Sequence, residues 1–526
     1  MKTNNKLFIV LGLALLLLAA STTWVFALDP TVPSGPRTLP DFFGAPAKAH
    51  PLANSRAPQN PFLAPNPYNH PHNDPWNSDA VDIAGPLGND PQVWSSTLAS
   101  VREYPDDALF NCTAMAFDSH GRPLTTCMGF HEAYVVLADK DTLEGLAAYP
   151  VPVPTNRLSA LGSMYSFLDN HDRFVVATYP DQVYILAEGG TETNPTLEKV
   201  GGYDLSVTVP DGDNIAGIMA DWQGRLWFSI AGAGAEPAQV CVLNPANYTD
   251  TDPGAKCVQF GTDGNGKNEL IRNTFALTKD GAYVVSSQRM YGIAAGPDDQ
   301  PYVMWSEPYQ TIGEVKPGQY SLGSGTSPTI VGNGKYVGIT DNDEQLHVVV
   351  YRTAERLGPN ETRVVCEVPV FENGAGAAEN SLVGFELSLL AENVYGYTFD
   401  FRTGAMTPNE PGFARVDIDP NGKGCSLGWE NDEITSNVCG HLSTRTGLYY
   451  TLSRKMDESM TDLQHPYGLD EYYWTALDWR TGEAVWEKWA GTGTWYDSWY
   501  SCIGMVPNGA MFLGEYGGVL AIRDTP

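Results

Sequence analysis

From about residue 95 to the C-terminus, short apolar stretches alternate with turns built on Asp, Asn or Gly. Each unit has an apolar strand, a tight turn and a second apolar strand, which is typical of a β-hairpin. The units lie at 115–127, 166–186, 218–230, 275–287, 329–341, 386–432 (a divergent copy), 442–453 and 504–524. Hairpin modules repeated every 40–60 residues, with no competing helical periodicity, predict the blades of a β-propeller.

The repeat count predicts an all-β fold with a single propeller, and eight blades are favoured over seven. The last unit holds only a hairpin before the chain ends at Pro526. A propeller can complete its last blade with a strand from the N-terminal side, which limits exposed sheet edges. Residues 100–105, SVREYP, are the predicted closing strand.

The N-terminal 94 residues are expected to lie outside the propeller. Residues 1–27 combine two early lysines, an apolar run and a small residue at Ala27. This pattern predicts a signal peptide or, if it stays uncleaved, a signal anchor. Residues 28–94 are rich in proline and are interpreted as an extended arm, with a tether favoured over a segment lying along the propeller. The propeller domain is then 95–526.

Eight cysteines in an exported chain favour disulfides over metal or redox chemistry, and no C-x-x-C motif occurs. Sequence proximity suggests the pairs Cys112–Cys127, Cys241–Cys257 and Cys425–Cys439, which leaves Cys366 and Cys502 for a long-range bridge. The expected location is therefore outside the cytoplasm: periplasmic, secreted or membrane-anchored and facing outward.

The chain is strongly acidic, with 62 Asp and Glu against 31 Lys and Arg and a formal charge of -31. Such a surface repels phosphate backbones, so nucleic acid is excluded as a partner. Anionic lipid is disfavoured for the same reason, so membrane contact is expected only through an uncleaved N-terminal anchor. The expected partner is a small molecule or a protein bound at the face of the central channel.

The segment TALDWRTGEAVWE (475–487) resembles the tryptophan-docking repeat of PQQ-dependent quinoprotein dehydrogenases, A-x-D-x-x-T-G-x-x-x-W. The matching residues are Ala476, Asp478, Thr481, Gly482 and Trp486. The resemblance implies a quinoprotein-like propeller of eight blades in which the turn bonds to itself and the tryptophan packs between blades. The family's adjacent Cys–Cys pair and its C-x-x-C-H haem motif are both missing. The resemblance therefore implies the architecture, and PQQ is the less favoured cofactor.

No nucleophile elbow, H-E-x-x-H zinc pair or phosphate-binding loop occurs in the sequence. Carboxylate and amide side chains instead cluster after apolar strands, and their oxygen atoms suit Ca²⁺. The predicted metal ligands are Asp341, Asn342, Asp343, Glu379, Asn380, Glu392 and Asn393. The alternative is that such residues cap turns through their own backbone.

A second group, His70, His72 and Asp74, has donors for a transition metal, although an exposed proline-braced loop would explain the same residues. The sequence thus favours an exported quinoprotein-like propeller that binds a ligand or acts as an interaction scaffold. The alternative function is a Ca²⁺-dependent propeller enzyme, either a PQQ oxidoreductase or a lactonase-like hydrolase.

Overall fold

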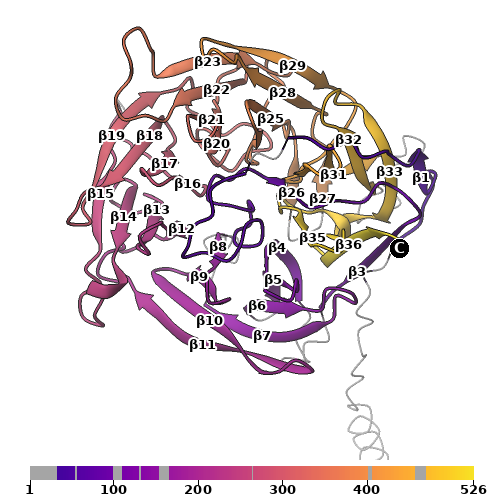
Figure 1. Ribbon diagram of the computed structural model, residues 1–526, viewed down its shortest axis with the longest axis horizontal. Coiled ribbons are helices and arrows are strands. Elements are labelled where there is room, and N and C mark those ends of the chain that lie inside the picture. Colours follow the sequence, from indigo (N-terminus) through magenta and orange to yellow (C-terminus); the bar gives the residue numbers. More distant parts are fainter. Residues whose placement is uncertain are drawn as a thin grey trace, which may run out of the picture.

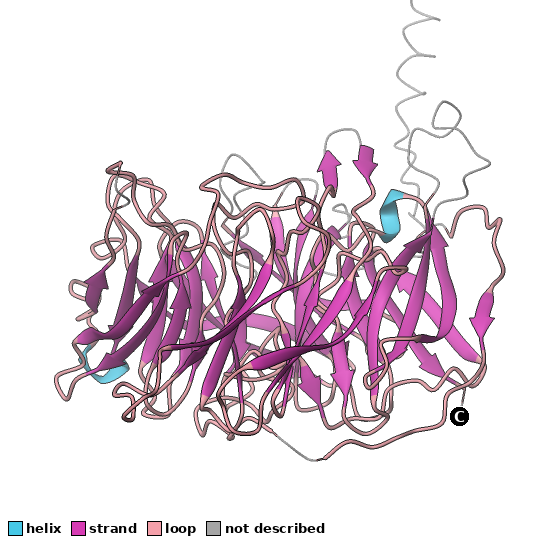
Figure 2. Ribbon diagram, turned by 90° about the horizontal axis from the view of Figure 1, so that it is seen from above, coloured by secondary structure: helices cyan, strands magenta, loops and turns pink. Residues whose placement is uncertain are grey.

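A computed structural model describes residue 32 and residues 34–53, 56–98, 109–129, 132–152, 165–262, 265–400, 405–455 and 470–525. The chain forms one β-propeller of eight blades, which confirms the predicted fold class and the favoured blade number (Figure 1). Seen edge-on, the strands form a disc with loops on both faces (Figure 2). The predicted signal segment, 1–27, and the predicted closing strand, 100–105, lie outside the described residues.

Each blade is an antiparallel sheet whose first strand lies next to the central channel. Blade 1 contains β4 (Leu109–Phe117), β5 (Pro123–Gly129), β6 (Ala133–Ala138) and β7 (Gly145–Val151). Blade 2 contains β8 (Ser166–Leu168), β9 (Phe174–Thr178), β10 (Gln182–Thr191) and β11 (Asn194–Asp204). Blade 3 contains β12 (Ile215–Ala220), β13 (Leu226–Ile230), β14 (Gln239–Leu243) and β15 (Lys256–Gln259), with the 3₁₀ helix η2 (Pro245–Asn247) before β15. Blade 4 contains β16 (Ala276–Leu277), β17 (Ala282–Val285), β18 (Arg289–Ala295) and β19 (Pro301–Pro308).

The second half of the ring carries two additions to this plan. Blade 5 contains β20 (Thr329–Val331), β21 (Tyr336–Thr340), β22 (His347–Arg352) and β23 (Val364–Pro369). Blade 6 contains β24 (Val383–Phe385), β25 (Ser388–Glu392), β28 (Phe413–Ile418) and β29 (Cys425–Asn431), with an inserted hairpin of β26 (Thr398–Asp400) and β27 (Ala405–Thr407). Blade 7 contains β30 (His441–Ser443), β31 (Leu448–Lys455), β32 (Glu471–Asp478) and β33 (Ala484–Thr492), flanked by β2 (Ala80–Val81) inside and β1 (Phe42–Gly44) outside.

Blade 8 closes the ring by joining the two ends of the propeller. It contains β34 (Gly504–Met505), β35 (Met511–Glu515) and β36 (Gly518–Asp524), preceded by the 3₁₀ helix η4 (Thr494–Tyr496). Its outermost strand is β3 (Pro91–Ser96), which pairs along β36 from Pro91↔Asp524 to Ser96↔Val519. The propeller is therefore closed by an N-terminal strand, as expected, but one that lies before the predicted segment.

The apolar faces of the blades are buried against one another. The hydrophobic clusters draw residues from neighbouring blades, as where Val135 of β6 and Val176 of β9 share one cluster. Likewise, Val350 of β22 and Val416 of β28 share another cluster. Close packing of sheet against sheet around the ring removes apolar surface from water, so neighbouring blades stabilise one another.

The inner hairpins of blades 1, 2 and 3 share a turn held by an aspartate and an arginine. In blade 3, Asp221 Oδ1 accepts from the backbone N–H groups of Gln223 at 2.8 Å and Arg225 at 3.0 Å, while Oδ2 pairs with the Arg225 guanidinium at 2.7 Å. Gly224 in that turn has φ of 79°, which a side chain would strain. Asp118 and Asp169 make the same contacts in blades 1 and 2. These aspartates cap turns.

Two of the three proposed disulfides are confirmed. Cys112–Cys127 joins β4 to β5, and Cys241–Cys257 joins β14 to β15. The pair Cys425–Cys439 and the long-range pair Cys366–Cys502 are both wrong, because the bonds are Cys366–Cys425 and Cys439–Cys502.

The physical reason is the path of the chain across a blade. Cys425 begins the outermost strand of blade 6 and faces β23 of blade 5, whereas Cys439 lies just before the innermost strand of blade 7. The few residues between them cross from the outer edge of the ring to its channel, so neighbours in sequence are not neighbours in space.

The proline-rich arm is not a tether. Its first part runs along the outer edge of blade 7, and residues 57–83 then cross the central channel (Figure 1). Seven hydrogen bonds, one to each of seven blades, are among those that join this second part to the innermost strands. They are Asn60 Nδ2 to Ala220 O and the backbone pairs Tyr68–Phe117, Asn69–Leu168, Pro75–Leu277, Trp76–Ile330, Ser78–Gly384 and Asp79–Leu442, between 2.7 and 3.1 Å.

We call residues 57–83 the channel arm. An extended segment without alternating apolar positions has no packed core of its own, but its backbone can satisfy the polar groups at the strand ends. Its interior position therefore does not depend on the hydrophobic pattern that identifies the blades.

Candidate functional site

The channel arm brings buried polar side chains to the centre of the propeller. His72 Nδ1 lies 3.2 Å from both carboxylate oxygens of Asp79 and 3.1 Å from Ser381 Oγ. Ser381 Oγ also donates to Asp79, and His441 Nε2 lies 2.7 Å from Asn73 Oδ1. All of these residues are buried. The arm supplies His72, Asn73 and Asp79, whereas Ser381 precedes β24 and His441 begins β30.

The hydrogen bonds fix the protons on the imidazole rings. Because the Asp79 carboxylate can only accept, His72 Nδ1 carries a proton. His70 Nδ1 accepts from the backbone N–H of His72 at 3.2 Å, so the proton of His70 lies on Nε2. His70 Nε2, His72 Nε2 and His441 Nδ1 have no hydrogen-bond partner among the described residues. Three buried imidazoles thus each present an unused ring nitrogen.

Burial keeps two of these histidines neutral. It lowers the pKa of His441 to about 4, with the charge of Asp79 opposing the shift. Burial and the neighbouring His72 lower the pKa of His70 well below its ordinary value. Neutral imidazoles can accept a proton or bind a metal ion, which protonated ones cannot do.

Two of the seven predicted metal ligands, Asn380 and Glu392, contact each other, and a third, Glu379, directly precedes Asn380 in the chain. Glu392 Oε2 accepts from Asn380 Nδ2 at 2.6 Å, whereas the buried Glu392 Oε1 has no partner among the described residues. Glu379 accepts from Ser321 Oγ at 2.9 Å. Burial raises the pKa of Glu392 to about 7 and that of Glu379 to about 8.

Two tyrosines each lie near more than one of these carboxyl groups. The charges of Glu379 and Asp79 both act on Tyr165, whose pKa is raised to about 12 chiefly by burial. Burial raises the pKa of Tyr500, and the charges of Glu379 and Glu392 add to this shift. The ring centroids of His72 and Tyr165 are 6.1 Å apart. We call Asp79, Glu379 and Glu392, with the adjoining Asn380, Ser381 and the three histidines, the channel site.

The other four predicted ligands hold loops. Asp341 lies 2.8 Å from His347 through Oδ2 and Nδ1, with Asp343 close by in the loop between β21 and β22. Lys316 Nζ donates to the backbone carbonyl of Asp343, so a cation already occupies this neighbourhood. Asn342 Nδ2 donates to two backbone carbonyls, and Asn393 Oδ1 accepts from two backbone N–H groups. Both amides thus fix loop backbone, as the turn-capping alternative expects.

The predicted group of His70, His72 and Asp74 is corrected in two respects. First, it is buried, with exposed fractions of 1%, 3% and 4%, so the exposed-loop interpretation is wrong. Second, Asp74 caps the turn of the arm by accepting from Trp76 N and Ser78 Oγ. The carboxylate partner of His72 is Asp79.

Sequence reasoning missed Asp79, Ser381 and His441. Each stands at or just before the start of a strand that lines the channel, namely β2, β24 or β30. A search for polar residues that immediately precede the inner strand of each hairpin could have identified the last two. The position of Asp79 depends on the path of the arm, and the arm contains no hairpin pattern that would identify this residue.

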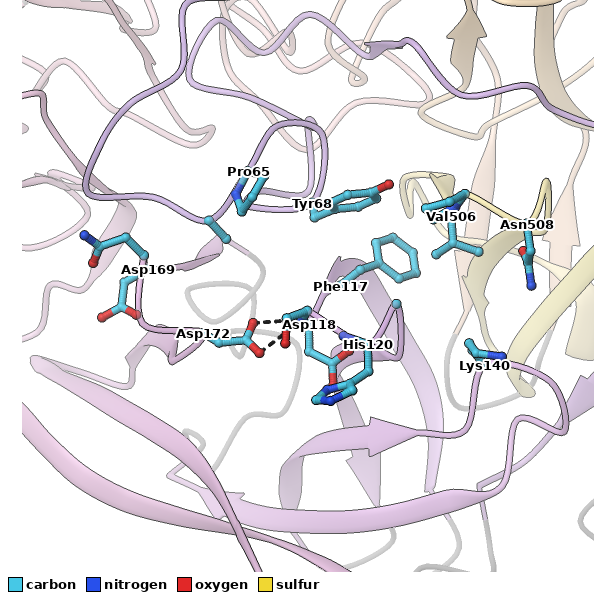
Figure 3. A pocket seen from close by; sticks show the side chains of 15 residues that line it. Pro65, Tyr68, Phe117, Asp118, His120, Lys140, Asp169, Asp172, Val506 and Asn508 are labelled. Carbon is cyan, nitrogen blue, oxygen red and sulfur yellow. Dashed lines mark hydrogen bonds and ion pairs between the residues drawn. The ribbon is translucent and has the colours of Figure 1, made fainter. Parts of the chain in front are cut away.

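A separate cavity lies where the arm passes blades 8, 1 and 2 (Figure 3). Its volume is about 480 Å³, and its apolar wall is formed by Pro65, Tyr68, Phe117 and Val506. The charged groups on its rim already have partners: Asp118 is paired with Arg122, and Lys140 with Asp141. The cavity is thus mainly an aromatic hollow whose rim includes paired carboxylates, whereas Glu379 and Glu392 of the channel site form no ion pair among the described residues.

No protein-family model matches the chain. An uncharacterized protein of Archaeoglobus fulgidus is 25% identical over 415 residues, which cover 72% of this chain and 74% of that protein. Among solved structures, Chaetomium thermophilum Sqt1, bound to the N-terminus of ribosomal protein L10, aligns with 10% identity and a TM-score of 0.47 over 79% of this chain and 97% of its own.

Two other structures illustrate the range of the similarity. The periplasmic gluconolactonase of Pseudomonas aeruginosa aligns with 13% identity and a TM-score of 0.38 over 60% of this chain and 84% of its own. Moraxella catarrhalis BamB aligns with 10% identity and a TM-score of 0.33 over 84% of this chain and 91% of its own. In the described part of the chain, no helix has the length and apolar character needed to span a membrane.

Proposed function

We propose that this protein is an exported, quinoprotein-like propeller that binds a divalent cation, best matched by Ca²⁺, and with it a small polar ligand in the central channel. The observation that carries the proposal is the group of three carboxyl side chains, Asp79, Glu379 and Glu392. Among the described residues, none of the three forms an ion pair with Lys or Arg.

A buried carboxylate without a counter-charge is costly, so it takes up a proton or a cation. Burial raises the pKa of Glu379 and Glu392, with the charge of Arg272 opposing the shift of Glu379, and this is the protonation alternative. Glu379, Glu392 and the Asn380 amide offer the oxygen donors that Ca²⁺ prefers, and the unpartnered Glu392 Oε1 is ready to accept one.

Other observations support the proposed export and the proposed quinoprotein-like architecture. Four disulfides favour an oxidising compartment. In the segment that resembles the quinoprotein repeat, the N–H of Gly482 donates to Asp478 O at 2.8 Å, and Trp486 packs against Tyr450 with ring centroids 6.1 Å apart. This self-bonded turn and buried tryptophan support a quinoprotein-like blade.

The test is Ca²⁺ binding by the oxidised full-length chain, measured by calorimetry and by elemental analysis after dialysis. We expect binding that tightens as the pH rises through 7 to 8, because the two glutamates then lose their protons. The variant E379Q/E392Q should bind at least about tenfold more weakly, since it lacks two anionic ligands. The exposed Glu372→Gln controls for net charge. No Ca²⁺ binding by the wild type, or equal binding by E379Q/E392Q, would overturn the proposal.

A second candidate function is a Ca²⁺-dependent hydrolase acting on lactones. It is favoured by His72, because Asp79 orients its imidazole and Nε2 has no partner among the described residues, which is the placement of a general base. Lactone hydrolysis that requires Ca²⁺ and is lost in H72Q would establish it. A spectral change on adding PQQ with Ca²⁺ would instead favour the oxidoreductase. A co-purifying protein, without Ca²⁺ binding, would favour a scaffold.

A further inference from the structure

One disulfide is unlike the other three because it lies against an imidazole in the channel. Cys439 precedes β30 and Cys502 precedes β34, and a parallel bridge joins their backbones. His72 Nδ1 of the channel arm lies 3.6 Å from Cys439 Sγ and 3.7 Å from Cys502 Sγ. Three segments that are far apart in sequence therefore bring two sulfurs and one ring nitrogen within 4.8 Å of one another.

The surroundings of this disulfide are closed and polar. Cys439, Cys502 and His72 are 2%, 5% and 3% exposed. Ser381 Oγ lies 3.5 Å from Cys439 Sγ, and Asp79 orients the His72 ring. In contrast, Cys112–Cys127 and Cys241–Cys257 staple strands within a blade, and Cys366–Cys425 joins two outer strands. A disulfide that only stabilises the fold does not require a histidine, a serine and an aspartate around its sulfur atoms.

We propose that reduction of Cys439–Cys502 converts this disulfide into a site for a thiophilic metal ion of the Zn²⁺ type, with His72 as the third ligand. Two thiolates and one imidazole form a donor set that Zn²⁺ prefers. Asp79, whose carboxylate oxygens lie 3.2 Å from the same ring nitrogen, is placed to complete the site as a fourth ligand.

Reduction of Cys439–Cys502 requires two electrons and two protons, which an external dithiol supplies. The dithiol gives two electrons and two protons to the S–S bond, and it becomes a disulfide while Cys439 and Cys502 become thiols. The metal ion then displaces both thiol protons to solvent and forms two metal–sulfur bonds. The His72 proton moves from Nδ1 to Nε2, which frees the nitrogen nearest the sulfurs for the metal.

This site does not depend on the proposed Ca²⁺ function. The Ca²⁺ proposal is tested with the disulfides intact through Glu379 and Glu392, whereas this site is built on two sulfurs and a nitrogen, shares only Asp79 with it, and exists only after reduction. Loss of one result therefore leaves the other standing.

The test uses Co²⁺ as a spectroscopic probe of the full-length chain, reduced anaerobically with a dithiol. Alkylation and mass spectrometry identify which cysteines have been reduced. We expect a thiolate-to-cobalt charge-transfer band that Zn²⁺ abolishes and that is absent from the oxidised protein. The variant H72Q keeps both cysteines and should weaken Co²⁺ binding by at least about tenfold. C439S/C502S should lose the band, and C241S/C257S should keep it.

Three outcomes would overturn the proposal. The first is a folded chain in which Cys439 and Cys502 resist reduction. The second is a reduced pair without the cobalt–thiolate band. The third is a band of equal strength in H72Q and the wild type. H72Q keeps the test decisive even if C439S/C502S fails to fold.

Discussion

The blades and the channel arm are both buried, but they are built by different interactions. A blade residue such as Trp474 is fully enclosed among apolar neighbours contributed by blades 7 and 8. The channel arm is held mainly through its backbone and through polar side chains such as Asn60 and Asp79. The comparison teaches that the repeated part of the sequence makes the ring, while a non-repeated segment adds His70, His72 and Asp79 to the polar residues that the blades bring to its centre.

The largest effect should come from removing a large side chain from either region. Trp76 of the arm is 8% exposed and packs with the core of blades 4 and 5. We expect Trp76→Ala and Trp474→Ala each to lower the free energy of unfolding by about 3–5 kcal/mol. Chemical denaturation measures both, and Trp495→Ala, at a residue 41% exposed, is the control. A negligible effect of Trp76→Ala would restore the tether interpretation.

A smaller change in the free energy of unfolding should come from Glu392 in the channel, and it should depend on pH. Burial raises the pKa of Glu392 to about 7, so the folded state holds its proton where the unfolded state has lost it. Its contribution to stability is complete below the unfolded pKa of about 4.5 and is lost as pH rises through about 7.

Without Ca²⁺, wild type should therefore lose about 2–3 kcal/mol relative to Glu392→Gln between pH 5 and 8. Denaturation curves across this pH range, with Glu372→Gln as control, measure the difference. Ca²⁺ at pH 8 should restore part of the loss in the wild type only. Parallel pH profiles for wild type and E392Q would contradict the assignment of Glu392 as a buried, uncompensated acid.

The smallest expected difference in stability is between removing a disulfide within a blade and removing one that joins two blades. Cys112–Cys127 closes a loop with a sequence separation of 15, whereas Cys366–Cys425 closes one of 59 and joins blades 5 and 6. Loop-closure entropy predicts that losing the longer bridge costs about 1 kcal/mol more, roughly 4 against roughly 3 kcal/mol. Thermal unfolding of C366A/C425A and C112A/C127A measures this. The reverse order would show that strand geometry outweighs chain entropy.

The same contrast explains what the sequence could predict. The hairpins were visible because strand alternation and turn residues such as Gly224 and Asp221 are local signals repeated eight times. Glu379, Asn380 and Glu392 were found because acidic and amide residues next to apolar strands are also a local signal.

The path of the arm, the partner of His72 and the Cys439–Cys502 bond all depend on which strand ends meet at the channel. That information lies in the closed ring and not in any stretch of sequence. Asp79 and His441, for example, are far apart in the chain, yet their side chains approach to 3.6 Å.

Hydrogen–deuterium exchange of the full-length chain tests most directly the central claim that residues 57–83 are a built-in part of the channel. Amide protons that are buried and hydrogen-bonded in a stable unit exchange only when that unit opens. We predict that peptides covering residues 68–83 exchange as slowly as those covering β20 and β30. Exchange of this segment at the rate of free, solvated chain, while the blades remain protected, would contradict the account.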